Sequence, residues 1–136
     1  MAEDLNQDGL VDVLVSTGSG LYLFWNSVAG LSSNAATAVR LTSSDTDAAV
    51  VADFNNDGFL DIASSGDSIL DVCMNLGSSS FAAATTIVNV GEAFGLATGD
   101  YNGDGPVYII HPSISSRYMC VDWIVCVNPI CSCALY

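Results

Sequence analysis

The sequence predicts an all-β fold built from repeated four-stranded units. One acidic string recurs three times along the 136 residues, and runs of apolar β-forming residues flank it. Glycines interrupt these runs as turns do, and no long stretch shows the period of a helix. Because 51% of the residues are hydrophobic, the chain is expected to fold as an ordinary domain instead of forming a disordered acidic tail.

The repeat is defined by three strings of the same design, which are DLNQDGLVD from Asp4, DFNNDGFLD from Asp53 and DYNGDGPVY from Asp100. Their spacing of about 48 residues lies in the range of the four-stranded blades of β-propellers. The likeness of the first two copies continues past the string, since Leu21 and Asn26 correspond to Leu70 and Asn75. A β-sandwich with evenly spaced turns is the alternative, but a sandwich does not require one loop three times.

Each unit is expected to run as strand, acidic hairpin loop, strand, turn, strand, Gly/Ser-rich loop, strand. The prediction is therefore a partial β-propeller of about two to two and a half four-stranded blades over residues 1–105. Met1 lies close to the first acidic loop, so we expect the strand that enters this loop to be missing.

The charge is strongly one-sided, with 15 acidic and two basic residues and a net charge of −13. Such a chain is not expected to bind nucleic acid or an anionic membrane, because both need a positive surface. More than half of the acids fall in the three strings, where they would repel one another without a neutralising cation. The sequence therefore favours cations as partners.

Calcium is the cation that the strings favour, because it takes six to eight oxygen ligands. The candidate side-chain ligands occupy the first, third, fifth and ninth positions: Asp4, Asn6, Asp8 and Asp12 at 4–12, and Asp53, Asn55, Asp57 and Asp61 at 53–61. Leu10 and Phe59, at the seventh position, would offer backbone carbonyls, and a glycine at the sixth would allow the sharp turn.

An EF-hand loop and a self-capped turn are the two alternatives to a calcium-binding hairpin. An EF-hand loop needs a glutamate at its twelfth position, where this chain has Val15, Ser64 and His111. The strings could also be turns that are capped by their own side chains without any metal. Such capping explains one turn easily but does not require four acidic or amide positions to recur together.

On these strings the chain resembles the FG-GAP/VCBS repeat family, which includes the calcium-binding blades of integrin α-subunit propellers. The resemblance covers about residues 2–105 and implies calcium in the hairpin between the first two strands of a blade. Carried over by position, it implies the ligands named above, with Leu10 and Phe59 acting through their carbonyls. It also implies a module for cell adhesion and extracellular or cell-surface recognition of a protein or glycan.

The third string and the segment after it depart from the pattern. Asp100, Asn102 and Asp104 remain in the loop at 100–105, but Tyr108 takes the ninth position, so this site is expected to be weak or vestigial. Residues 106–136 hold all three prolines and the only histidine, and are expected to be an atypical tail, either non-native sequence or disordered. The chain is therefore expected to be a fragment of a larger propeller.

An enzyme is not expected, because the only histidine lies in the anomalous tail and no nucleophile or phosphate-binding motif occurs. A lectin-like glycan binder, with Tyr22 and Trp25 stacking on sugars, is one alternative, although aromatic residues on strands are more often core. Non-catalytic accessory repeats of a larger enzyme are another. The chain shows no signal peptide, so the extracellular location is inferred for the parent protein alone.

Overall fold

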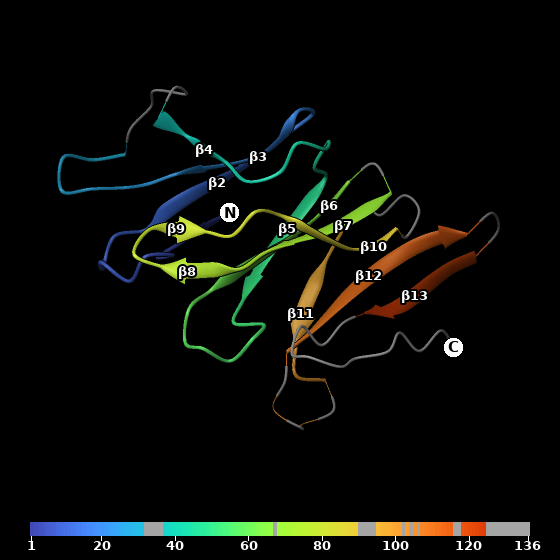
Figure 1. Cartoon of the computed structure of the whole chain (residues 1–136). Helices are drawn as coiled ribbons and strands as arrows, with labels where there is room; N and C mark the ends of the chain where they lie inside the picture. The colour runs from blue at the N-terminus through green and yellow to red at the C-terminus, as the bar shows by residue number, and fades with distance from the viewer. Residues whose placement is uncertain are drawn as a thin grey trace.

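The computed structural model describes residues 1–31, 37–66, 68–89, 95–101, 103, 105, 107–115 and 118–124. These residues form thirteen β-strands and contain no α-helix. Figure 1 shows the strands in three main antiparallel sheets that follow one another in chain order. The predicted all-β class is confirmed, and the arrangement is compatible with a partial propeller.

The first sheet is a four-stranded meander in the order β1 (Ala2–Glu3), β2 (Asp12–Thr17), β3 (Gly20–Phe24) and β4 (Val39–Arg40). The first acidic loop joins β1 to β2, where the hairpin was predicted. The expectation that the entering strand is missing is wrong, because the short strand β1 pairs with β2. Met1 extends this short pairing, since its amino group donates to the carbonyl of Leu14 at 3.0 Å and its carbonyl accepts the N–H of Leu14 at 2.9 Å.

The second sheet repeats this plan with β5 (Ala48–Ala52), β6 (Asp61–Gly66), β7 (Ile69–Cys73) and β10 (Thr85–Asn89). Its register matches that of the first sheet. Ile62 pairs with Cys73 as Val13 pairs with Phe24. Ile62 follows Val13, and Cys73 follows Phe24, by the spacing of the first two repeats.

A small hairpin of β8 (Asn75–Gly77) and β9 (Ser80–Phe81) is inserted between the third and fourth strands of the second sheet. Its turn residues Ser78 and Ser79 both have positive φ, at 53° and 59°, which is the backbone of a tight two-residue hairpin. The repeat pattern did not predict this hairpin.

The third sheet contains β11 (Ala97–Gly99), β12 (Tyr108–Ser115) and β13 (Tyr118–Ile124). The third acidic string lies between β11 and β12, as the other two lie between the first two strands of their sheets. Residues 108–115 and 118–124 of the expected tail therefore form a strand pair, which continues the third sheet.

The core lies between the sheets, because alternate residues of a strand point to opposite faces. Ile62 of β6 packs with Leu14, Leu21 and Leu23 of the first sheet. The next residue, Ala63, belongs to a second cluster that includes Ile109 of β12. The second sheet is thus buried on both faces, one against each neighbour.

Candidate metal-binding loops

The three acidic loops share two positions at which the described backbone has positive φ. The fourth position has positive φ in each, at 60° in Gln7, 60° in Asn56 and 74° in Gly103. The sixth position is a glycine with positive φ each time, at 86°, 90° and 101° along the chain. Because other residues rarely adopt this conformation, the recurring glycine is required by the turn.

The first loop gathers its acid and amide side chains around the turned backbone. The carboxylate of Asp4 accepts the N–H of Asp8 at 3.1 Å and that of Gly9 at 2.8 Å. Asn6 accepts the same Asp8 N–H at 3.2 Å, and its amide donates to Asp8 Oδ2 at 3.1 Å. Asp8 Oδ1 accepts the N–H of Leu10 at 2.8 Å. These bonds hold the first, third and fifth side chains beside one another.

The second loop repeats these bonds atom for atom. Asp53 accepts the N–H of Asp57 at 3.1 Å and that of Gly58 at 2.8 Å. Asn55 accepts the Asp57 N–H at 3.0 Å and donates to Asp57 Oδ2 at 2.8 Å, while Asp57 Oδ1 accepts the N–H of Phe59 at 2.8 Å. The sequence repeat is therefore also a repeat of side-chain geometry.

The aspartates at the ninth position lie deeper than the others. Asp12 and Asp61 are each 0% exposed, whereas Asp8 and Asp57 are exposed. Asp12 accepts the N–H of Leu5 at 3.1 Å and that of Asn26 at 2.8 Å.

Asp61 is placed in the same way, since it accepts the N–H of Phe54 at 3.0 Å and that of Asn75 at 2.8 Å. Burial raises the pKa of the Asp61 carboxyl above its usual range, the two backbone N–H groups oppose this effect, and the charges of Asp57 and Asp53 add to it. In this geometry each ninth-position carboxylate connects its loop to the end of the third strand. It lies deeper than the side chains at the first, third and fifth positions, which together form what we call the loop mouth.

The third loop keeps part of the pattern. Asp100 accepts the N–H of Gly103 at 2.7 Å and that of Gly105 at 2.9 Å. Tyr108 pairs with Gly99 across the strands, as Asp12 pairs with Glu3 and Asp61 with Ala52. The tyrosine thus stands where the other loops have their buried carboxylate. Asn102 and Asp104 lie outside the described residues.

The donor set of the first two loops fits a hard cation. Carboxylate and amide oxygens line each loop mouth, and calcium prefers such ligands. Among the described residues, no three His, Cys, Asp or Glu side chains are gathered closely enough to hold a metal ion. The geometry joins the first, third and fifth positions but not the ninth, so the full ligand sets stay predictions.

Sequence reasoning missed the contacts that join the first loop to the second repeat. The buried amide of Asn75 donates to the carbonyl of Leu5 at 2.8 Å and to that of Leu60 at 3.1 Å. Gln7 donates to the carbonyl of Gly58 at 2.7 Å. The recurrence of Asn26 and Asn75 at corresponding positions was a signal for the first contact. The contact of Gln7 had no signal in the sequence.

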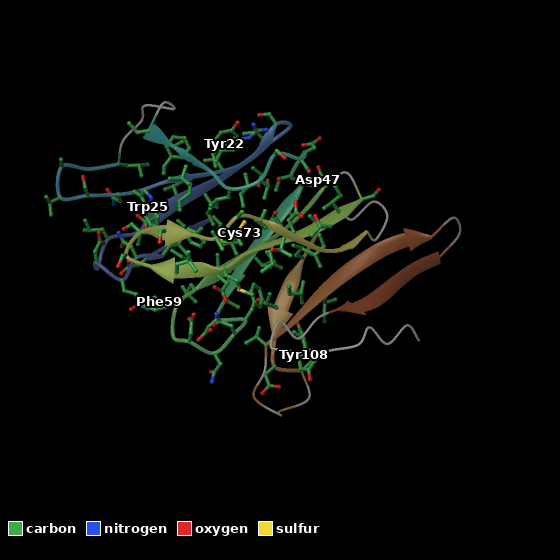
Figure 2. The ribbon with its side chains drawn as sticks, in the orientation of Figure 1. Tyr22, Trp25, Asp47, Phe59, Cys73 and Tyr108 are labelled. Atoms are coloured by element: carbon green, nitrogen blue, oxygen red, sulfur yellow. The ribbon has the colours of Figure 1, made fainter. Side chains whose placement is uncertain are left out.

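The aromatic residues proposed for sugar stacking have partners within the protein. Trp25 stacks on Phe81, with ring centroids 6.2 Å apart, and lies beside β9 in Figure 2. The guanidinium of Arg40 lies 5.9 Å from the centre of the Tyr22 ring. Trp25 therefore packs against the core, and Tyr22 makes a cross-strand contact within the first sheet.

Repeated antiparallel sheets with an acidic hairpin loop between their first two strands define a propeller-like repeat module. The family model of the FG-GAP-like repeat matches residues 4–64 and, in a second copy, residues 53–110. The chain therefore belongs to the FG-GAP-like repeat family, as the resemblance indicated. Searches of the curated proteins and of the solved structures find no match for this chain.

Proposed function

We propose that this chain is a calcium-binding repeat module that serves extracellular or cell-surface recognition of a protein or a glycan, as in adhesion. The observation that carries the proposal is the identical hydrogen bonding of the first two loops around Asp4, Asn6 and Asp8 and around Asp53, Asn55 and Asp57. A turn that needed only capping would not require the same oxygens at the same places in both copies.

Charge supports the choice of a cation. The loops concentrate carboxylates in a chain whose net charge is −13 and which has only two basic residues. Of these, Arg40 donates to the backbone carbonyls of Ser19, Thr42 and Ser43, away from the loops. Arg117 lies outside the described residues. A divalent cation would remove the repulsion of the carboxylates at each loop mouth.

In the proposed site, Asp4, Asn6, Asp8 and the Leu10 carbonyl would hold one calcium ion. Asp53, Asn55, Asp57 and the Phe59 carbonyl would hold another. Bound calcium supplies a positive charge that rigidifies the hairpin. Asp12 and Asp61 would anchor each loop from below. They would bind the ion directly only after turning toward the loop mouth, and otherwise through a bridging water.

The extracellular location rests on the site class, because extracellular modules work with calcium sites of roughly 10⁻⁴–10⁻³ M. None of the described residues forms a helix that is long and apolar enough to cross a membrane. Repeats of this family are generally non-catalytic modules. No observation favours the lectin alternative, since Trp25 and Tyr22 already have partners.

Thermal unfolding by circular dichroism tests the proposal, first in EDTA and then in millimolar calcium, with magnesium as the control ion. Millimolar calcium is up to about ten times the Kd of such sites, and at that ratio a ligand that binds only the folded chain stabilises it by about 1.4 kcal/mol at each of the two loops. We expect calcium to raise the Tm by roughly 5 °C or more.

The expected rise is smaller in Asp53→Ala and in Asp57→Ala. Asp47→Ala removes the same charge from an exposed position outside the loops and should keep the full rise. A Tm that calcium leaves unchanged in the parent chain would reduce the loops to self-capped turns.

A further inference from the structure

The first loop and the second repeat are joined by direct contacts at the loop mouth. Gln7, between the proposed ligands Asn6 and Asp8, donates its side-chain amide to the carbonyl of Gly58 at 2.7 Å. The N–H of the same Gly58 donates to Asp53 of the second loop at 2.8 Å. One residue of the second loop, Gly58, therefore makes hydrogen bonds to both loops.

A second connection runs through the buried layer below. The N–H of Leu5 donates to Asp12 at 3.1 Å, and the carbonyl of Leu5 accepts from the side chain of Asn75 at 2.8 Å. The backbone N–H of Asn75 then donates to Asp61 at 2.8 Å. A chain of hydrogen bonds thus links the two ninth-position aspartates, and none of its four residues is more than 2% exposed.

These connections place both loops in one network that must be ordered together. Leu5 lies between the proposed ligands Asp4 and Asn6, and Asp61 ends the second loop. An ion bound in one loop holds that loop still, which lowers the ordering cost for an ion in the other. Buried polar networks transmit such effects because a displaced member leaves its partners unsatisfied.

We infer that the first two loops bind calcium with positive cooperativity, which Gln7 and Asn75 transmit from one repeat to the next. This inference rests on the proposed calcium function and adds a coupling between its two sites. Coupling of this kind is reciprocal, so each filled loop should raise the affinity of the other by the same factor.

Isothermal calorimetry on the whole chain measures the coupling, in an Asp100→Ala background that silences the third loop. Asp8→Ala disables the first loop and Asp57→Ala disables the second, so each variant reports one site alone. We expect the product of the two stepwise binding constants in the parent to exceed the product of the single-site constants by roughly fivefold or more.

Matched variants in the two repeats test the route. Gln7→Ala removes the contact with Gly58, and Asn56→Ala changes the corresponding exposed residue, which has the same φ of 60°. We expect the coupling factor to fall toward one in the first variant and to stay at the parent value in the second. Equal coupling in the two variants would overturn the role of Gln7.

The buried route is tested in the same way. Asn75→Ala removes the donor to Leu5, and Asn26→Ala changes the corresponding residue, whose side chain donates to Val11 in its own repeat. Of these two variants, only Asn75→Ala is expected to lower the coupling factor. If that variant does not fold, hydrogen exchange of the Leu5 amide in Asp8→Ala replaces it, and we expect calcium at the second loop to slow the exchange.

Failure of the inference and failure of the proposed function give different results. Calcium that binds the parent with single-site constants matching those of the one-loop variants would refute cooperativity and leave calcium binding intact. Unchanged exchange at Leu5 would also count against the buried route. No calcium binding in the parent, in either calorimetry or exchange, would remove the proposed function and this inference with it.

Discussion

The carboxylate of Asp61 accepts the backbone N–H of Asn75 at 2.8 Å, the same distance at which Asp12 accepts that of Asn26 in the preceding repeat. Each bond spans 14 positions and fastens the acidic loop to the end of the third strand of its sheet. The ninth position of the string therefore has a structural task in the described geometry, in addition to the ligand role that was predicted for it.

Replacing Asp61 by asparagine is expected to destabilise the chain in EDTA. The amide has one acceptor oxygen, so either the N–H of Phe54 or that of Asn75 would face a second donor. An unsatisfied buried donor costs about 1–3 kcal/mol, and we expect the free energy of unfolding to fall by about 2 kcal/mol. Urea denaturation measures it. Asp57→Asn makes the same charge change at an exposed position and should alter stability far less.

Gly66 is expected to reject any side chain. A Cβ at this position, where β6 ends, would collide with the carbonyl oxygen of Asp45. The obstacle is backbone, so it cannot turn aside as a side chain would, and Gly66→Ala should cost about 2–3 kcal/mol. Gly95→Ala is the control, because a Cβ there meets no atom within 4 Å. Similar midpoints of denaturation for the two variants would contradict the close approach.

The buried thiol of Cys73 is expected to make the chain less stable at high pH. Burial, followed by the charge of Asp71, raises the pKa of this thiol to about 11 from an ordinary value of 9.0. The folded state thus favours the protonated thiol. Its contribution is fully present below pH 9.0 and is lost as the pH rises through about 11.

The difference between the pKa of Cys73 in the folded and in the unfolded chain corresponds to about 2–3 kcal/mol of folding free energy. The free energy of unfolding, measured by urea denaturation between pH 8 and 11, should therefore fall more steeply with pH for the unsubstituted chain than for Cys73→Ala. The variant also provides the control, because tyrosines and other thiols titrate in both proteins. Parallel curves would show that Cys73 does not ionise differently on unfolding.

The all-β class, the period and the position of each acidic loop could be predicted from the sequence because they depend on local signals. Alternating apolar residues indicate strands, and a glycine at the sixth position of each string indicates a turn with positive φ. These signals recur in every copy, so the repeat itself reinforced them. Strand β1 was missed because two residues carry too little periodicity to be recognised.

Only the tertiary structure decided how the repeats meet. Asn75 contacts Leu5 across 70 positions, and Gln7 reaches Gly58 across 51. It also decided that Asp12 and Asp61 lie buried below their loops while Asp8 and Asp57 stay exposed. The amino-acid sequence shows which oxygen-bearing residues are near one another along the chain. Which of them face solvent, and which satisfy a buried N–H, depends on the packing of one sheet against the next.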